Sequence, residues 1–446
     1  MTQYHARRLP LHRGPAAWDA ILPPRIAGPA LTEDTDVDFA IIGGGFAGVA
    51  AARRLAQLAP DARIAVLEAG HVAQGASGRN SGFMIDLPHD LKSENYAGPQ
   101  GDLDAIGLNR RAIAFARDAV ADYEIDHNFF DPVGKINGAA SPAAHANNAQ
   151  YAAHLEGLGE VFEHLDAQQM QEITGSTYYV SGLFSPGTVM LQPAGYMRGI
   201  VDGLRRDGVM VFENTPVTAF KQDRSGWCVT SPQGSLRTDK IILTVNGHLE
   251  SFGHARGRLM QLFLFATMTP DLDLDAVRGL GGHSRWGITP ADPMGTTLRR
   301  IDTGQGGNRI VTRTCAALRS GTVAKPSDLR RAVKIMRRKF DSRFPQLAKV
   351  EMEHAWAGHL CLSMNGASVT REIDKGVYAG CVQNGLGTAR GTLTGIAAAE
   401  LACGVQSDIT RHFVNEPAPS RLPPPSVRDL SANAVLRWKE WKARAE

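Results

Sequence analysis

The sequence predicts an α/β protein, α+β overall, in which a parallel-sheet domain is interrupted by an inserted unit built on an antiparallel sheet. The first observation is an apolar run at residues 38–42, which passes through three glycines into a small-residue helix. The second is another apolar run at residues 63–68, which suits a neighbouring parallel strand. The third is the pair of runs 296–302 and 309–314, which flank a glycine turn as in an antiparallel hairpin.

The glycines after the first run have the spacing of a nucleotide-binding turn. Gly43, Gly45 and Gly48 match G-x-G-x-x-G between a strand and a helix. Glycine permits the tight turn and lets the backbone approach a pyrophosphate at the helix N-terminus. Glu68 ends the next strand 25 residues after Gly43, where a ribose-binding carboxylate belongs. The pattern predicts a Rossmann-type dinucleotide site, with a purely structural glycine turn as the alternative.

A second glycine-rich stretch follows this acid directly. Residues 69–84 contain Gly75, Gly78 and Gly82 around the pair Arg79-Asn80. A loop of this composition can place its backbone against a flat ligand. A flexible surface loop is the alternative, but the position after the ribose acid favours contact with the nucleotide.

The composition excludes several functional classes. The chain has 446 residues, 43% of them hydrophobic, with a net charge of +3 and no basic run interleaved with aromatics, so no nucleic-acid partner is expected. No window approaches the ~18 apolar residues of a membrane span, and the N-terminus lacks a signal-peptide core. We therefore expect a cytoplasmic protein without a membrane partner. The five cysteines show no C-x-x-C spacing, so neither a disulfide framework nor a metal site is expected.

The order of these signals predicts a discontinuous domain organisation. Residues 1–36, rich in proline, are expected to form an extended arm anchored by Trp18. The nucleotide-binding domain is expected from residues 37–88, 191–249 and 354–404, and the substrate-binding domain from residues 89–190 and 250–353. Residues 405–446 form the expected C-terminal extension, whose tryptophan-containing helix packs on the surface or on a second subunit of a homodimer. Apolar spacing predicts further helices at residues 103–126, 143–159, 193–204 and 329–344.

Three of these stretches together resemble a known signature. The run from Gly43 to Gly48, the acid Glu68 and the run from Gly75 to Gly82 are similar to the FAD-binding signature of the D-amino-acid oxidase superfamily. The Ala-Ser-Gly-Arg-Asn form resembles the glycine oxidase, sarcosine oxidase and γ-glutamylputrescine oxidase branch, which has Gly-Gly or Gly-Gln after the asparagine where this chain has Ser81 first. The resemblance implies a Rossmann-type FAD-binding domain with FAD contacts at Gly43, Gly45, Phe46, Ala47, Gly48, Glu68, Ala69, Ser77, Gly78, Arg79, Asn80, Ser81, Val217, Asn246, Gly385, Leu386, Gly387 and Thr388.

The last four of those residues form a glycine loop that departs from the family pattern. Relatives usually carry Gly-x-Ser-Gly-His-Gly there, whereas this chain has Gln383 and Asn384 followed by Gly-Leu-Gly. The glycines are kept, and a backbone at a helix start stabilises negative charge on the reduced flavin. The loss of the serine and histidine predicts a substrate different from those of the better-known members.

The resemblance implies FAD-dependent oxidation of a C–N bond in a small primary or secondary amine or an amino acid. Hydride passes to flavin N5, and the imine hydrolyses to an aldehyde or keto acid. Molecular oxygen, giving hydrogen peroxide, is the expected acceptor. A dehydrogenase for amines or 2-hydroxy acids that uses another acceptor is the alternative, and a regulatory protein with a structural nucleotide is a third class.

Candidate catalytic residues are His359, Asn384 and Arg299. His359 and His248 lie near cofactor segments and are able to orient substrate, although packed histidines are equally consistent with the pattern. Arg299 and Arg300 lie in the strand that lines the pocket in relatives; strand alternation turns only one of them inward, where it would bind an acidic group, and an ion pair at the sheet edge is the alternative. Asn384 and Gln383 border the flavin loop.

Cys361 raises the question of covalent flavin attachment, because sarcosine oxidase relatives use a cysteine upstream of the final glycine loop. The local pattern around Cys361 does not reproduce theirs, and its spacing to the loop differs. We therefore expect FAD to be bound without a covalent bond.

Overall fold

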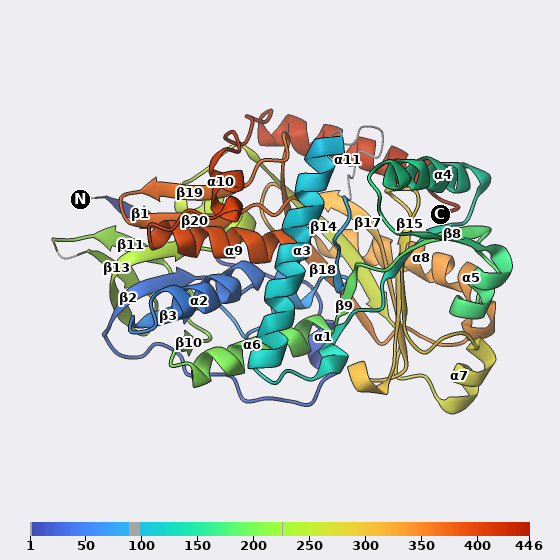
Figure 1. The fold of residues 1–446 in the computed structure, drawn as a ribbon, viewed down its shortest axis with the longest axis horizontal. Helices are drawn as coiled ribbons and strands as arrows, with labels where there is room; N and C mark the ends of the chain where they lie inside the picture. Colours follow the sequence, from blue (N-terminus) through green and yellow to red (C-terminus); the bar gives the residue numbers. More distant parts are fainter. Residues whose placement is uncertain (1, 89–98, 225) are drawn as a thin grey trace.

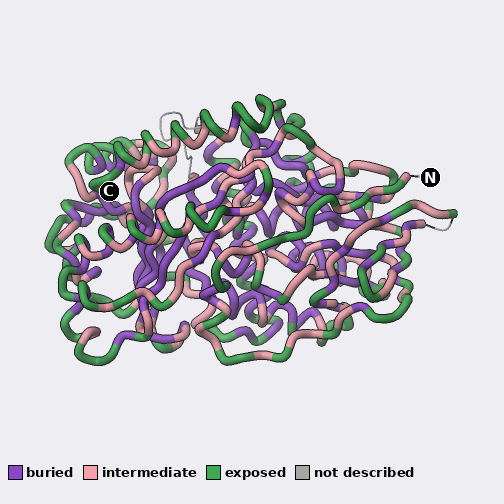
Figure 2. The backbone as a smooth tube through the Cα atoms, turned by 180° about the vertical axis from the view of Figure 1, so that it is seen from behind, coloured by how far each residue is buried: buried purple, intermediate pink, exposed green. Residues whose placement is uncertain are grey.

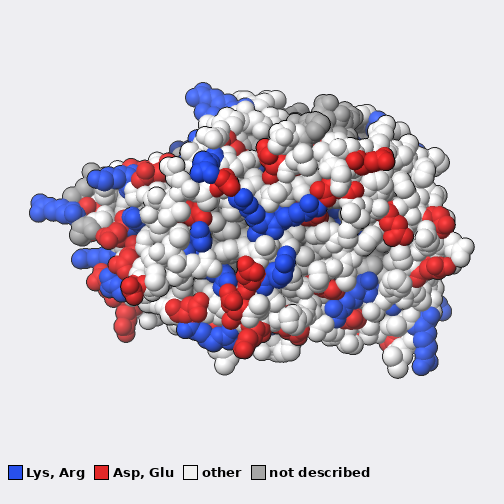
Figure 3. Space-filling view, viewed as in Figure 1, with Lys and Arg blue, Asp and Glu red and all other residues white. Residues whose placement is uncertain are grey.

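The computed structural model describes residues 2–88, 99–224 and 226–446. Two large sheets lie side by side along the long axis of the molecule, each with helices on its outer side (Figure 1). Buried residues are concentrated in the interior of the molecule, and exposed residues lie mainly along its outline (Figure 2). On the face shown in Figure 3, basic and acidic side chains are interspersed.

The nine-stranded sheet forms the first unit. Its core is parallel in the order β20-β13-β2-β3-β10, and an antiparallel extension of β12, β11 and β1 pairs with the first half of β13. The strands are β1 (Gln3–His5), β2 (Thr35–Ile42), β3 (Ile64–Leu67), β10 (Met210–Phe212), β11 (Ala219–Gln222), β12 (Trp227–Thr230), β13 (Ser235–Leu243), β19 (Val369–Asp374) and β20 (Val377–Cys381).

Four helices pack around the parallel core: α2 (Phe46–Leu58), α3 (Pro99–Asp122), α6 (Pro193–Arg206) and α9 (Ala389–Ala402). Small residues allow α2 and α9 to approach closely, because a Cβ at Gly395 would lie 2.1 Å from the carbonyl oxygen of Ala47. The smaller α10 (Asp408–Val414) contacts α9. The alanine- and glycine-rich composition of these helices therefore follows from backbone proximity.

The eight-stranded sheet forms the second unit, in the order β18-β14-β17-β16-β15-β6-β8-β7. Its pairs are antiparallel except β15 with β6, which is parallel. The strands are β6 (Lys135–Ala139), β7 (Glu163–Asp166), β8 (Ser181–Ser185), β14 (Leu259–Met268), β15 (Trp286–Pro290), β16 (Thr297–Ile301), β17 (Arg309–Leu318) and β18 (His354–Ser363). Helices α4 (Pro142–Gly157), α5 (Ala167–Thr174), α7 (Leu274–Leu280), α8 (Pro326–Arg343) and α11 (Pro425–Lys442) belong to this half.

Short elements join the two units. The N-terminal segment contributes β1 to the first sheet and then the short helix α1 (Ala17–Ala20), where Trp18 is completely buried. A small sheet in the order β4 (Phe83–Met84), β9 (Val189–Leu191) and β5 (Phe130–Asp131) lies between the large sheets. No helix of the described residues is long and apolar enough to cross a membrane.

The mixed α/β class, the parallel core and the 296–314 hairpin predicted from the sequence are confirmed. Two strands lie in a different sheet from the one that the expected domain ranges imply. Strand β18, within the range 354–404, is hydrogen-bonded into the eight-stranded sheet, and β1, within the expected arm, pairs with β11 of the first sheet. Periodicity places helices but not the partners of isolated strands, which the tertiary fold decides. The first ten residues of the range 89–190 lie outside the described residues.

Candidate active site

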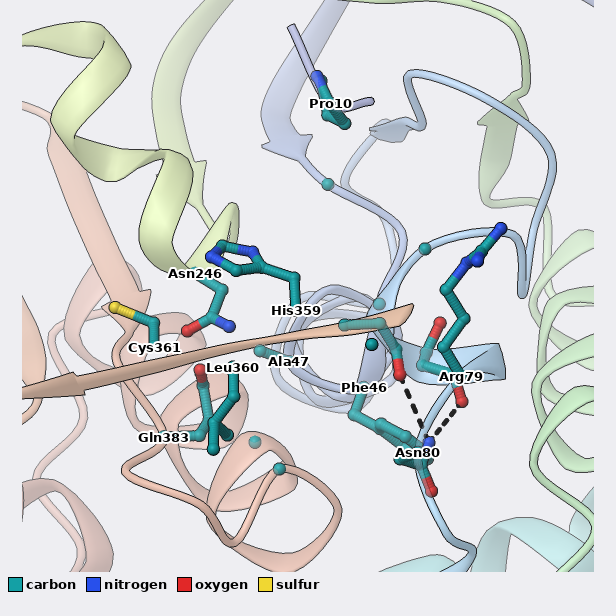
Figure 4. A pocket seen from close by; sticks show the side chains of 18 of the residues that line it. Pro10, Phe46, Ala47, Arg79, Asn80, Asn246, His359, Leu360, Cys361 and Gln383 are labelled. Carbon is teal, nitrogen blue, oxygen red and sulfur yellow. Dashed lines mark hydrogen bonds between the residues drawn. The ribbon is translucent and has the colours of Figure 1, made fainter. Parts of the chain in front are cut away.

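A large cavity lies where the carboxyl ends of the parallel strands meet the inner face of the eight-stranded sheet. Gly43 follows β2, Glu68 follows β3, Thr244 and Asn246 follow β13, and Gln383 follows β20, and all five line the cavity. Because parallel strands present their carboxyl ends at one sheet edge, segments from distant parts of the sequence converge there. Figure 4 shows Asn246, His359, Cys361 and Gln383 on one side of this cavity and Arg79 and Asn80 on the other.

The three glycines of the first turn have separate physical roles. Gly43 has φ +106°, and a Cβ there would lie 2.9 Å from the Thr244 carbonyl oxygen. A Cβ at Gly48 would lie 1.9 Å from the carbonyl oxygen of Gly43, so this glycine permits helix-to-strand packing and does not itself line the cavity. A Cβ at Gly45 would meet no heavy atom within 4 Å, so its backbone is open to a ligand.

Glu68 lines the cavity at the end of β3. Its carboxylate accepts hydrogen bonds from the backbone N–H of Gly44 at 2.8 Å and of Gly70 at 3.0 Å. Burial raises the pKa of Glu68, and these two N–H donors oppose that rise. The acid is therefore held rigidly at the position that the G-x-G-x-x-G spacing predicts for a ribose ligand.

The loop after Glu68 is braced by its own polar groups. Asn80 accepts a hydrogen bond from Gly82 N at 2.7 Å and donates one to Ser77 O at 2.6 Å. Ser77, Arg79, Asn80 and Ser81 line the cavity, as does Ala69 before them. Gly78 instead packs behind the loop, where a Cβ would lie 1.7 Å from the Ala73 carbonyl oxygen.

The final glycine loop lines the cavity from Gly385 to Thr388, directly before α9. The hydroxyl of Thr388 donates to Phe83 O at 2.8 Å, which ties the loop to the small central sheet. The N-terminus of α9 thus opens toward the cavity, where its dipole favours negative charge. Phe46, Ala47, Val217 and Asn246, the other expected cofactor contacts, also line the cavity.

The cavity lining fits an elongated, polar ligand with a pyrophosphate. A Cβ at Gly45, Gly75 or Gly387 would point into empty space, although all three border the cavity. Within the part of the chain that the structure describes, three buried polar atoms at the cavity, Asn246 Oδ1, His248 Nδ1 and Thr297 Oγ1, have no hydrogen-bond partner. Buried polar atoms are normally satisfied, so these three indicate bound molecules that supply their partners.

Three histidines line the cavity: His12, His248 and His359. Burial lowers the pKa of His359 to about 3 and the pKa values of His12 and His248 to about 4. His359 Nε2 lies 2.8 Å from Gln261 Oε1, and the Gln261 amide nitrogen in turn donates to Glu250 Oε2 at 2.8 Å. This chain of contacts places the proton of the neutral ring on Nε2, so the other ring nitrogen is the acceptor.

Two of the three expected catalytic residues lie outside the cavity lining. Arg299 is 2% exposed; it donates to Leu191 O and to Gln305 Oε1 at 3.1 Å, and it lies over the Trp18 ring at 5.0 Å. Asn384 is used in loop structure, since its oxygen accepts from Ser363 N at 2.7 Å and its nitrogen donates to Gly366 O at 2.8 Å. Of the three, only His359 lines the cavity.

Arg313 lines the cavity and was not singled out from the sequence. In the register of the hairpin, Arg313 of β17 lies opposite Thr297 of β16 and Ala266 of β14, and all three border the cavity. Arg299 is two residues from Thr297, so it shares that face but lies farther along the strand, beneath Gly82 and Leu191. The sequence predicted the hairpin that contains Arg313. The register between β16 and β17 then decided which arginine reaches the cavity.

The charge of Arg313 has no acid beside it. Its Nε donates to Ser81 Oγ at 3.4 Å, and no ion pair to Arg313 exists among the described residues. Burial lowers its pKa to about 10, which leaves the guanidinium charged at neutral pH. Beside it, Thr297 Oγ1 is a buried hydroxyl oxygen without a partner among residues 2–88, 99–224 and 226–446. A cation and a free hydroxyl on one wall are suited to an anionic group.

Cys361 and Gln383 also line the cavity. Cys361 is completely buried, and burial raises the pKa of its thiol well above the usual value, which disfavours the nucleophilic thiolate. The Gln383 amide nitrogen donates to Gly380 O at 3.2 Å and to Thr394 Oγ1 at 3.1 Å, so this side chain is anchored on α9.

Comparisons with known proteins agree with this architecture. The chain is 24% identical over 414 residues to probable oxidoreductase OrdL of Rhizobium meliloti (strain 1021), covering 90% of this chain and 91% of that protein. It is 23% identical to γ-glutamylputrescine oxidoreductase of Escherichia coli (strain K12), covering 84% and 85%. The crystal structure of glycine oxidase from Geobacillus kaustophilus matches the fold with a TM-score of 0.68 at 16% identity, covering 84% of this chain and 96% of that one.

The family model for DAO, FAD dependent oxidoreductase, matches residues 38–401, which run from within β2 to the last turn of α9. That range contains both glycine turns, Glu68 and the complete inner wall of the eight-stranded sheet. The cavity lining fits the cofactor named by this family. The chain therefore belongs to the DAO family of FAD-dependent oxidoreductases, and its cofactor is FAD.

Proposed function

We propose that this protein oxidises the C–N bond of a small primary or secondary amine that carries an acidic group, such as an amino acid. Bound FAD supplies the acceptor for the hydride that leaves the substrate carbon. Loss of that hydride and a proton gives an imine, which water hydrolyses to a carbonyl product and ammonia or an amine. The names of two relatives, glycine oxidase and γ-glutamylputrescine oxidoreductase, support this substrate class.

The proposal that the substrate has an acidic group rests on the Arg313 guanidinium. It lies in the cavity wall and has no acid beside it among the described residues. A partly buried cation such as Arg313 is stabilised when an anion pairs with it. A substrate carboxylate at Arg313 would supply that anion and would accept a further hydrogen bond from the Thr297 hydroxyl. Specificity for an acidic amine follows from this pairing.

His359 has a limited role in this proposal. With a pKa of about 3, its ring stays neutral at physiological pH and does not retain a proton taken from the substrate. Its Nε2 faces Gln261, so the other ring nitrogen would accept a hydrogen bond from the substrate. We assign it to orienting the neutral amine, which loses its ammonium proton to water before oxidation.

The experiment that tests the substrate class is anaerobic bleaching of the flavin with matched pairs of amines. N-methylglycine and glycine are compared with dimethylamine and methylamine, which lack the carboxylate. We expect bleaching by the acidic members and an apparent Kd weaker by about tenfold to hundredfold in Arg313→Gln, the range for a lost charge-assisted hydrogen bond. Arg278→Gln, at an exposed arginine on α7, is the control. Equal bleaching by both members of each pair would contradict the proposal.

We further propose that molecular oxygen is the electron acceptor. The support is the name of the structural relative glycine oxidase. Stopped-flow mixing of the substrate-reduced protein with aerated buffer measures reoxidation directly. Reoxidation within seconds with stoichiometric hydrogen peroxide is expected. Persistence of the reduced flavin for minutes would assign the protein to the dehydrogenases, and bleaching by 2-hydroxy acids but not by amines would change the substrate class.

A further inference from the structure

Helix α11 has its polar side toward the protein and its apolar side toward solvent. The exposed residues Val427, Leu430, Val435, Trp438 and Trp441 are 51–77% exposed, with Leu430 at 77% and Trp441 at 60%. Leu430, Trp438 and Trp441 recur at helical spacing and so form one stripe. An ordinary surface helix shows the reverse pattern, with the apolar face buried.

The inward face of α11 explains how this orientation is fixed. The backbone N–H groups of Ala316 and Leu318, at the end of β17, donate to Glu440 Oε1 at 2.9 Å and to Asn433 Oδ1 at 3.1 Å. Asp429 accepts hydrogen bonds from the backbone and the hydroxyl of Ser320. Strand β16 begins at Thr297, which pairs with Arg313, so the edge of β17 after Arg313 has no strand partner on that side. Polar side chains of α11 accept hydrogen bonds from its backbone N–H groups instead.

Both acids of α11, Asp429 and Glu440, therefore accept hydrogen bonds from the rest of the protein. Exposed cations, in contrast, lie near the apolar stripe. Glu440 also pairs with Arg331 of α8 at 2.8 Å, which holds the two helices together. Lys334 and Arg338 of α8 are three and seven residues beyond Arg331, so they lie on the same side of α8. Neither these two nor Lys439, Lys442 and Arg444 form an ion pair within the described residues.

We propose that the outward face of α11, with the neighbouring cations of α8, docks on an anionic lipid surface. Helices that lie in a membrane interface combine an apolar stripe containing tryptophan with lysine and arginine beside it. Lys442 Nζ lies 4.6 Å from the Trp438 ring and the Arg444 guanidinium lies 4.5 Å from the Trp441 ring, so the cations border the apolar stripe directly. Such a helix lies on the membrane and requires no spanning segment (Figure 1 shows α11 along the upper edge of the molecule).

The charges argue against a second copy as the occupant. A two-fold contact through this face would bring two identical faces together, each bearing the unpaired cations of α11 and with no free acid on either α11. Nucleic acid is disfavoured because the stripe begins with the aliphatic Val427 and Leu430 and offers no hydrogen-bond donors there. Anionic lipid supplies both the negative charge and the apolar layer that the stripe requires.

The test is sedimentation of the FAD-loaded protein with vesicles of phosphatidylcholine alone or with about one third phosphatidylglycerol, a content that gives a negative surface potential. Binding to the anionic vesicles, weaker at high salt and accompanied by a blue shift of tryptophan fluorescence, is expected. Trp438→Gln with Trp441→Gln, and separately Lys439→Gln with Lys442→Gln, are expected to lower the partition coefficient by about tenfold or more. Leu274→Gln with Arg278→Gln on α7, also exposed, is the matched control and is expected to bind normally.

Flavin content and substrate-dependent bleaching verify that each variant is folded, and they test the oxidoreductase function separately. Equal binding to both vesicle types, or no binding to either, would overturn the proposal. So would a dimer in light scattering that the tryptophan variant converts to a monomer, because the stripe would then be an interface between copies. Preferential binding of a polyanionic oligonucleotide over anionic vesicles would also overturn it.

Discussion

The guanidinium of Arg79 donates a hydrogen bond to the carbonyl oxygen of Gly14 at 2.9 Å, which fastens the N-terminal segment over the cavity. The same side chain donates to Arg13 O at 3.1 Å and to Gln74 O at 2.7 Å, with no carboxylate in contact. Residues 8–10 and His12 of this segment line the cavity between that attachment and β1. In Figure 4 the guanidinium points away from Asn80, so Arg79 acts at the cavity mainly by holding backbone.

Replacing Arg79 with glutamine should release this segment. Glutamine is too short to reach the carbonyl oxygens that Arg79 binds, so these acceptors would be left without donors. The Arg79 guanidinium itself is buried, which lowers its pKa to about 10. The expected loss is about 1–3 kcal/mol of unfolding free energy, the range for buried unsatisfied groups. Urea unfolding measures the loss, and limited proteolysis should cut near residues 8–14 faster than in the parent. An unchanged cleavage rate there would show that the segment is held by other contacts.

The two glycines Gly45 and Gly48 should respond oppositely to a side chain. Gly48→Val places a Cβ 1.9 Å from the Gly43 carbonyl oxygen, so we expect misfolded or insoluble protein. The Cβ of Gly45→Val would meet no protein atom within 4 Å at the cavity, so the apoprotein should fold with the parental circular dichroism spectrum but retain little FAD. Flavin absorbance per mole of soluble protein is the measurement. Full FAD content in Gly45→Val would contradict the assigned role of this turn.

The cavity histidines should make the protein acid-sensitive. In the unfolded chain a histidine binds a proton near pH 6.5, whereas the folded values are about 3 for His359 and about 4 for His12 and His248. Between these limits the unfolded state binds more protons, so stability falls as the pH is lowered below 6.5. The free energy of unfolding falls by about 1.4 kcal/mol per pH unit for one such histidine.

Urea unfolding at pH 7 and pH 5 measures this slope, and His359→Asn should reduce it, since asparagine does not titrate. His71→Asn, at an exposed histidine outside the cavity lining, is the comparison variant. A parental slope in His359→Asn would mean that His359 titrates normally in the folded protein.

Acid precipitation should release the flavin. Because the buried Cys361 thiol has a raised pKa, the thiolate that covalent attachment would require is disfavoured. A yellow supernatant and a colourless pellet are expected, and Cys361→Ser should keep its FAD. A yellow pellet that becomes colourless in Cys361→Ser would demonstrate attachment at this residue.

Much of the cofactor half was predictable because it depends on local chemistry. Gly43, Gly45 and Glu68 follow strands whose apolar runs are visible in the sequence, and a strand–turn–helix places such residues at the sheet edge without knowledge of the rest of the fold. The helices at residues 143–159 and 329–344 were predicted within a few residues, because their apolar spacing is local. The separate roles of Gly45 and Gly48 required the packing distances.

The substrate wall was not predictable in the same way. Arg299, Arg300 and Arg313 all lie in the predicted hairpin, but which one reaches the cavity depends on the register between β16 and β17 and on the segments Gly82 and Leu191 that cover Arg299. Asn384 lay beside the expected flavin loop, yet its side chain satisfies the backbone of residues 363 and 366. Hydrogen-bond partners far apart in sequence compete for a polar side chain, and only the folded chain decides between them.

The sequence by itself determined the FAD-binding turn, its acid and the family, because strand periodicity and glycine spacing act over short distances. The tertiary structure alone decided that Arg313 rather than Arg299 borders the cavity, that the N-terminal segment closes it through Arg79, and that α11 turns its apolar side outward. These three depend on strand register and on contacts between residues more than 60 positions apart, as with Arg79 and Gly14. No local pattern encodes such contacts, because burial of the whole chain selects them.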